Sequence, residues 1–355
     1  MDGREKSGSG TILRYAVSLS TLLGEDLFIH NIRAGRRKPG LRPQHLKGVL
    51  ALSEMSGGTV DHAQVGSHQI LYKPGEQIRG GYYKWDIGTA GSTTMLAATA
   101  LPAACFATGP VRFKIKGGLF QDYAPSAHHM QHILLPLLKG MGVQAHLRII
   151  RPGYVPRGGG VIEVSVEPVA GRIRPIQLLS PGNIGEIKGI AISSHLKKRR
   201  VSERMAKKCR AVLKAEGYEA QIEEIYDTTS LQEGASLALF SHSDTGCIIG
   251  SDRAGKPGRS SEEIGRYVTK NWLQDIKTGA TVDRYLADQL ILYAALGEGT
   301  TEYLIPRMTE HVDTNLWLVN RILGAKTTLK DNRLSIDGIG FKCKAASSEK
   351  PELKS

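Results

Sequence analysis

The histidine at position 311 has the surroundings best suited to covalent chemistry in this sequence. It lies in the first turn of a predicted helix, EHVDTNLWLVNRIL (310–323), beside an apolar face of Val312, Leu316, Val319 and Leu323. The positive end of a helix disfavours an imidazolium, so a histidine there tends to stay neutral and nucleophilic. A polar surface residue is the alternative interpretation, and the local pattern leaves both open.

A second predicted helix, TVDRYLADQLILYAAL (281–296), could present polar groups to the same cleft. Tyr285, Asp288, Gln289 and Leu292 share one of its faces. A carboxylate and an amide would then point in one direction. The alternative for Asp288 is a solvated position on the helix surface.

Groups that bind phosphate are concentrated in an arginine-rich loop. The segment RAGRRKPGLRPQHL (33–46) combines two loop glycines with Arg33, Arg36, Arg37, Lys38 and Arg42. Arginine makes bidentate contacts with phosphate, and the Gly35 and Pro39-Gly40 positions give the loop a defined shape. A solvated surface loop remains the alternative.

Glycine-rich turns precede three predicted helices, at SGSG (7–10), TAGS (89–92) and KTGAT (277–281). The free N–H groups and the dipole of a helix start attract phosphate, and glycine lets the backbone approach it. Three such turns favour a shared anion site, although each alone fits an ordinary turn. The triple glycine 158–160 excludes side chains, for tight packing or for function.

These residues are positioned by a repeated order of elements. Helix, strand, helix, strand and strand recur three times in the hydrophobic pattern, with helices over 11–23, 42–55, 95–106, 124–138, 281–296 and 310–323. Pro102 is expected to kink or bound its helix. We predict an α+β (α/β) fold whose large domain has three units, each with two helices and a four-stranded sheet.

Residues 182–277 break this rhythm and predict an inserted α+β domain. The large domain then comprises 1–181 and 278–343. The polar tail 344–355 is expected to be disordered. LKKRR (196–200) opens a helix of the inserted domain, where an exposed helix start is favoured over an RNA contact or a nuclear address.

The composition limits the class of partner. The 355 residues carry a formal net charge of +13, which points to a polyanion such as nucleic acid or nucleotide. Aromatic residues make up only 6%, which argues against base stacking as the main binding mode. Four cysteines without metal spacing, and no apolar run long enough for a membrane helix, predict an intracellular protein, nuclear if eukaryotic and otherwise cytoplasmic.

Several segments together resemble the RNA 3′-terminal phosphate cyclase family over nearly the whole chain. They are TILR (11–14), IRAGRRKPGLRPQHL (32–46), AGS (90–92), GYVPRGGGVI (153–162), YLADQL (285–290) and HVDTN (311–315). The resemblance implies three repeats similar to the C-terminal domain of a translation initiation factor, plus one smaller inserted domain.

The resemblance also implies a reaction. The His311 equivalent takes AMP from ATP, AMP passes to an RNA 3′-terminal phosphate, and the neighbouring 2′-hydroxyl closes a 2′,3′-cyclic phosphate. A divalent metal, Mg²⁺ or Mn²⁺, is expected as cofactor. The implied roles are ATP binding for Tyr285, Asp288, Gln289 and Pro125, and phosphate or RNA binding for Arg14, Arg36 and Gln44.

Two departures from the family pattern bear on activity. The family usually reads Glu-Gly-Gly-Gly-Gln where this chain reads SGSGT, so Ser7 stands at a glutamate associated with metal and Thr11 at the glutamine. Glu5 lies two residues away as a possible substitute. A family glutamine near the nucleotide is Ala98 here. We therefore expect weakened, slow or altered activity.

Two other protein classes compete with the cyclase interpretation. A non-catalytic, cyclase-like protein of ribosome assembly would use the basic surface to hold RNA or protein, but that branch lacks the nucleophile, whereas His311 is present here. Enolpyruvyl transferases share a related repeat architecture, but HVDTN and the triple-glycine segment favour the cyclases.

Overall fold

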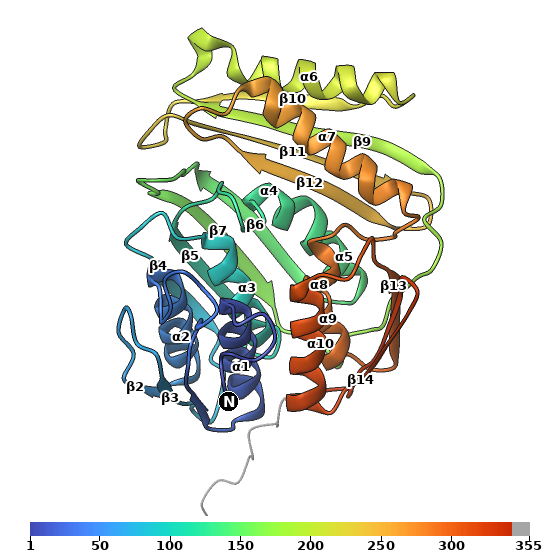
Figure 1. Ribbon diagram of the computed structural model, residues 1–355. Helices are drawn as coiled ribbons and strands as arrows, with labels where there is room; N and C mark the ends of the chain where they lie inside the picture. The colour runs from blue at the N-terminus through green and yellow to red at the C-terminus, as the bar shows by residue number, and fades with distance from the viewer. Residues whose placement is uncertain (343–355) are drawn as a thin grey trace, which may run out of the picture.

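The computed structural model describes residues 1–342 (Figure 1). These residues form four small mixed or antiparallel sheets with helices packed against them, which confirms the predicted α+β fold. The tail 344–355, predicted to be disordered, lies outside the described residues. Within residues 1–342, no helix is both long and apolar enough to cross a membrane.

The second repeat has the most complete sheet, with strand order β4-β5-β7-β6. Its strands are β4 (Gly81–Asp86), β5 (Val111–Gly117), β6 (Gln144–Arg151) and β7 (Gly160–Glu167). β4 runs parallel to β5, while β7 is antiparallel to β5 and β6. Its helices are α3 (Thr93–Ala104), α4 (Ala127–His129), the π-helical turn η1 (Met130–Leu134) and α5 (Leu135–Gly140).

The third repeat has the same strand order, β8-β13-β15-β14. It contains β8 (Gln177–Leu178), α8 (Leu286–Gln289), α9 (Ile291–Leu296), β13 (Thr300–Leu304), α10 (Glu310–Leu323), β14 (Lys326–Lys330) and β15 (Arg333–Asp337). Again the first strand is parallel to the second. The predicted helix 310–323 has the observed bounds because Thr309 caps its start and Gly324 takes the left-handed conformation at its end.

The first repeat departs from the four-stranded expectation. It contains α1 (Gly10–Leu23), β1 (Leu27–Ile29), α2 (Pro43–Ser56), β2 (Thr59–Asp61) and β3 (Ile70–Lys73), and its sheet has three strands in the order β1-β3-β2. The place of the leading strand is taken by the N-terminal residues, where Asp2 forms a single parallel bridge with His30. The sequence pattern missed this segment and β8 because both are too short to show alternation.

The helix predicted over 281–296 is shorter and broken. It begins at Leu286 because Asp283 accepts the backbone N–H groups of Tyr285 and Leu286. It is divided at Leu290 into α8 and α9. Similarly, the helix predicted over 124–138 contains the π-helical turn η1 between α4 and α5. Pro102 lies inside α3, two residues before its end.

Residues 184–277 form the remaining sheet, at the top of Figure 1. Its strands are β9 (Ile184–Ser194), β10 (Gln221–Asp227), β11 (Gly234–Ser243) and β12 (Ile248–Ala254), and its helices are α6 (Val201–Ala215) and α7 (Ser261–Lys277). The helices enclose a separate apolar cluster around Trp272 and Leu213. Phe240 and Ile248 instead join the main core, so this sheet packs against the repeats and brings β12 to their central cavity.

Candidate active site

The start of α1 brings a hydroxyl and a guanidinium group together. Ser9 caps the helix by accepting the N–H of Thr11 at 3.3 Å. One turn further on, Arg14 Nη2 donates to Thr11 Oγ1 at 2.8 Å. Burial lowers the pKa of Arg14 to about 10, so the group remains a cation at neutral pH. Thr11 and Arg14 therefore form one polar unit on the inner face of α1.

His311, near the other end of the sequence, contacts Thr11 of this unit. Its Nδ1 atom lies 3.4 Å from Thr11 Oγ1, although the two residues are 300 positions apart. Burial lowers the pKa of the half-buried imidazole, and the charges of Arg14 and Arg36 lower it further. The ring is therefore neutral at neutral pH and has a lone pair on one nitrogen.

Three elements are fixed to one another beside His311 by a buried amide. Asn315, one turn further along α10, donates through Nδ2 to Tyr15 Oη at 2.9 Å and to the carbonyl of Asp288 at 3.0 Å. The Tyr15 hydroxyl also donates to the Asp288 carbonyl at 3.0 Å. These contacts join α1, α8 and α10, and they fix the backbone at Asp288.

The Asp288 carboxyl group has an unusually high pKa. Burial raises its pKa from 3.8 to about 7, and the negative charge of Asp283 also raises it, while Arg14 and His129 lower it. A carboxyl group with this pKa changes charge near neutral pH. This is a property typical of functional sites.

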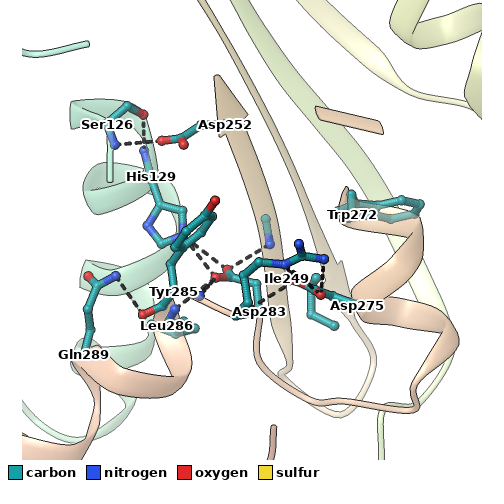
Figure 2. A network of polar contacts seen from close by, with 12 residues as sticks. Ser126, His129, Ile249, Asp252, Trp272, Asp275, Asp283, Tyr285, Leu286 and Gln289 are labelled. Atoms are coloured by element: carbon teal, nitrogen blue, oxygen red, sulfur yellow. Dashed lines mark hydrogen bonds and ion pairs between the residues drawn. The ribbon is translucent and has the colours of Figure 1, made fainter. Parts of the chain in front are cut away.

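A buried ion pair holds the start of α8 (Figure 2). The His129 and Asp283 side chains are fully buried, with Nε2 and Oδ2 3.2 Å apart. Burial alone lowers the pKa of His129, but the charge and hydrogen bond of Asp283 raise it overall. Asp283 also accepts N–H groups of Tyr285 and Leu286, each at 2.9 Å, and of Gly250 at 3.1 Å. One carboxylate therefore connects α4, β12 and α8.

Asp252 on β12 makes a second buried polar contact near His129, as Figure 2 shows. Its carboxylate accepts the Ser126 N–H at 2.7 Å, and Ser126 Oγ in turn accepts the His129 N–H at 3.1 Å. Burial raises the pKa of Asp252. The neighbouring Pro125 is fixed because its carbonyl accepts the Thr94 hydroxyl at 2.7 Å.

These elements enclose a cavity of about 650 Å³, a size suited to a nucleotide-sized ligand. The residues singled out in the sequence that line it include Thr11, Arg14, Arg33, Arg36, Gln44, Ala98, Pro125, Tyr285, Asp288, Gln289, Leu292 and His311. Ser7 lies just outside, with its Oγ 2.9 Å from Ser9 Oγ and its N–H donating to Thr314 Oγ1. The cavity thus joins residues from all three repeats and from residues 184–277.

The basic loop has the defined shape that its glycines predicted. Arg33 donates through Nη1 to the carbonyls of Lys38 and Gly40, at 2.7 and 2.8 Å, and Gly40 has a φ of +76°. Arg33 and Arg36 line the cavity, whereas Arg37 is exposed outside it. Gln44 Oε1 accepts the Ser92 N–H at 2.8 Å, linking this loop to the start of α3.

The glycine-rich segments have different roles. Gly10 lies in the cavity lining, whereas residues 89–92 and 277–281 are outside it, so the three turns do not form one shared site. The triple glycine serves backbone packing. A Cβ on Gly160 would lie 2.6 Å from the Gly153 nitrogen, and one on Gly158 would lie 2.7 Å from the Ala90 Cα.

Sequence reasoning missed Tyr15 and Asp252, which line the cavity, and the buried pair His129 and Asp283, which holds the start of α8. Asp283 had a usable signal, because aspartate is a preferred residue just before a helix. The other three had none, since their roles come from contacts between distant segments.

The donor set does not fit a metal held by protein carboxylates. Among residues 1–342, no group of three or more His, Cys, Asp or Glu side chains is arranged to hold an ion. Ser7 offers only a hydroxyl, and Glu5 instead forms an ion pair with Arg321 at 3.4 Å. The positive charge of the cavity lining comes from Arg14, Arg33, Arg36 and Arg253.

Comparison with known proteins gives a consistent result. Residues 5–329 match the family model described as RNA 3'-terminal phosphate cyclase. Proteins with that name from Pyrococcus furiosus and Caldivirga maquilingensis are 36% and 37% identical, over 91% and 92% of this chain and 93% and 92% of their own. The protein of the same name from Pyrobaculum neutrophilum is 34% identical, over 96% of this chain and 99% of its own length.

A solved structure, the enolpyruvyl transferase NikO from Streptomyces tendae, has 13% identity and a TM-score of 0.42, covering 95% of this chain and 48% of that one. The family match covers the chain from α1 into β14, including residues 184–277 and the segments that carry His311, Asp288 and Arg36. The chain belongs to the RNA 3′-terminal phosphate cyclase family.

Proposed function

We propose that this protein uses ATP to convert an RNA 3′-terminal phosphate to a 2′,3′-cyclic phosphate, with His311 as the nucleophile. The observation that carries the proposal is the neutral His311 ring, held by Thr11 beside Arg14 and Arg36 in the cavity. The names of the relatives, which describe this cyclase activity, support it.

The hydrogen bond to Thr11 selects the attacking nitrogen. Thr11 Oγ1 accepts from Arg14 and has a second lone pair that can accept Nδ1–H of His311. The lone pair then lies on Nε2. We expect Nε2 to form a bond with the α-phosphorus of ATP as the bond to pyrophosphate breaks, while Arg14 and Arg36 offset the charge on the phosphate oxygens.

The covalent step divides one difficult exchange into easier ones. The AMP group passes from Nε2 to an oxygen of the RNA 3′-phosphate, which breaks the P–N bond and restores the neutral ring. The vicinal 2′-hydroxyl then loses its proton and attacks the phosphorus of the RNA 3′-phosphate, and AMP leaves. Each step is an attack on phosphorus in a cavity that is lined by four arginine side chains, Arg14, Arg33, Arg36 and Arg253.

The rest of the cavity supplies the nucleotide pocket in this proposal. Tyr285 and Pro125 offer flat apolar surfaces, while Asp288 and Gln289 offer polar atoms. Ala98 removes one polar contact that the family pattern leads us to expect. No step above requires a protein-held metal; a divalent ion that accompanies ATP would be coordinated by phosphate oxygens.

Self-labelling tests the nucleophile directly. Incubation with ATP labelled at the α-phosphorus should leave acid-labile label on the protein, and His311→Ala should abolish it. His62→Ala is a matched control, since His62 is exposed and outside the cavity. Label that persists in His311→Ala would overturn the assignment of this residue.

A second function has specific support. Ser7 and Ala98 remove polar contacts from the expected site, which favours a binding protein that holds RNA without adenylylation. Absence of label in the unmodified protein across metals and pH values, together with retained RNA binding, would establish this alternative.

A further inference from the structure

We propose that the exposed face of the sheet β4-β5-β7-β6 binds the single-stranded body of the RNA upstream of its 3′ end. This inference rests on the proposed function, because it extends the path of an RNA whose terminal phosphate lies in the cavity. The surface is defined here as the basic sheet face, formed by Tyr82, Lys84, Asp86, Arg112, Lys114, Lys116, Arg148, Ile150, Arg151 and Glu163.

Strand alternation separates this face from the core. In β5, Val111, Phe113 and Ile115 are buried, whereas Arg112 and Lys116 between and after them are exposed. The strand register places Lys84 beside Lys114, and Asp86 beside Lys116. Neighbouring strands are about 4.8 Å apart, so Lys84, Lys114 and Lys116 lie close together in an array on this face, with Asp86 beside Lys116.

The array surrounds a shallow groove of about 570 Å³. Its lining includes Lys84, Lys114, Lys116 and Arg151 from the sheet, and Thr229 from the turn after β10. Residues 184–277 therefore contribute one residue to its lining. The groove is a shaped site rather than an isolated charged loop.

The charges on the basic sheet face do not cancel. Lys116 pairs with Asp86 at 2.8 Å and Arg148 pairs with Glu163 at 3.2 Å. Within residues 1–342, Lys84, Arg112, Lys114 and Arg151 form no ion pair with a carboxylate. Four cations thus remain available to a polyanion.

Apolar groups lie among the cations. Tyr82 is 50% exposed and Ile150 is 41% exposed. The Lys84 ammonium lies 5.2 Å from the centre of the Tyr82 ring. Unstacked bases can pack on such groups while the phosphates meet lysine and arginine, whereas a duplex hides its base faces. The surface therefore favours a single strand.

The basic sheet face is connected to the cavity through one turn. Asp86 at the end of β4 accepts the Gly88 N–H at 2.8 Å, and Ser92 at the start of α3 donates to Gln44, which lines the cavity. The turn 87–92 joins the two sites. A strand with its 3′ end in the cavity can continue over this turn onto the sheet.

The test compares RNA lengths. We would replace Lys84 and Lys114 with glutamine, leaving Arg151 intact because it also donates to the Gly159 carbonyl. The KM for a 3′-phosphorylated dodecanucleotide should rise about tenfold, and the slope of log affinity against log salt should fall by about 0.7 for each cation removed. The KM for a 3′-phosphorylated dinucleotide and the self-labelling with ATP should not change.

Matched controls and direct binding keep the two proposals separate. Lys326→Gln with Lys330→Gln on the edge strand β14 removes equal charge elsewhere and should leave both KM values unchanged. Equal KM changes for both lengths, or no change for either, would overturn the inference. If the unmodified protein fails to label, the proposed function fails. Fluorescence anisotropy then tests the inference by itself, by comparing the affinities of the unmodified protein and the variants for the dodecanucleotide without its 3′-phosphate. Tighter binding of a duplex than of the strand would also contradict it.

Discussion

The Nδ1 atom of His311 lies 3.4 Å from the Oγ1 atom of Thr11, which also accepts a 2.8 Å hydrogen bond from Arg14. A helix start from the first repeat and a helix start from the third thus share one hydroxyl. The resemblance to the family implies glutamine at the Thr11 position, so in this chain a shorter side chain contacts the histidine.

This contact predicts that Thr11→Val slows self-labelling. The isosteric change removes the hydroxyl that contacts Nδ1 of His311 and accepts from Arg14, and the loss of about 1 kcal/mol corresponds to an about fivefold lower rate. Thr11→Ser keeps the hydroxyl and should retain most of the rate. Single-turnover labelling measures both, and equal rates for Val and Ser would show that the hydroxyl does not orient the ring.

The same geometry predicts the pH dependence of the nucleophile. Burial, Arg14 and Arg36 lower the pKa of His311, so its titration midpoint should lie below 6.5. The neutral ring persists above this midpoint, and self-labelling should be lost as pH falls through it. Arg36→Gln should move the midpoint upward by removing a nearby cation. The ring-proton shifts of His311 in NMR report the midpoint, and a value above 6.5 in the unmodified protein would contradict the prediction.

Local signals in the sequence were sufficient for several elements of the site. Thr309 and Gly324 cap the two ends of α10, and Ser9 and Gly24 cap the two ends of α1. The sequence alone therefore predicts that His311 and Arg14 lie on these helices. The resemblance then grouped residues that the cavity indeed brings together. Their chemical roles remain proposals.

Other parts of the site depend on contacts that a local pattern does not contain. The helix predicted over 281–296 begins only at Leu286, because Asp283 is held before it by His129 and Gly250, which come from α4 and β12. Asp252 reaches the cavity wall only because its sheet packs on the main core. Such positions are set by tertiary packing, which overrides the periodicity of a short segment.

Asp288 predicts a stability change with pH. Its pKa is raised to about 7, so between about pH 4 and 7 the folded protein holds a proton that the unfolded chain has released. The free energy of unfolding should therefore decrease as pH rises through this window. Asp288→Asn removes this effect, and its stability relative to the unmodified protein should improve by about 1–2 kcal/mol between about pH 5 and 8. Urea unfolding of both proteins at the two pH values measures this change. If the difference in unfolding free energy between the two proteins is the same at both pH values, the pKa of Asp288 is near its ordinary value.

The His129–Asp283 pair predicts a large stability loss. Asp283→Asn leaves a buried histidine without its counter-charge and should cost about 3 kcal/mol in unfolding free energy. Glu298→Gln is the control, because its ion pair with Arg172 is exposed at 46% and 43% and should be worth less than about 1 kcal/mol. Thermal and urea unfolding compare the variants, and similar small losses in both would show that the buried pair is not a structural junction.

Ser7 predicts a gain of function. Its hydroxyl lies 2.9 Å from that of Ser9, which lines the cavity, and the resemblance to the family implies glutamate at this position. Ser7→Glu supplies a carboxylate at the start of α1, where negative charge is also favoured by the helix dipole. We expect faster self-labelling and half-saturation at about tenfold lower Mg²⁺ or Mn²⁺ concentration. Ser7→Gln is the matched control, since it adds the same bulk without the charge. If the glutamate variant gains nothing at any metal concentration, or if glutamine gains as much, the missing carboxylate does not limit this site.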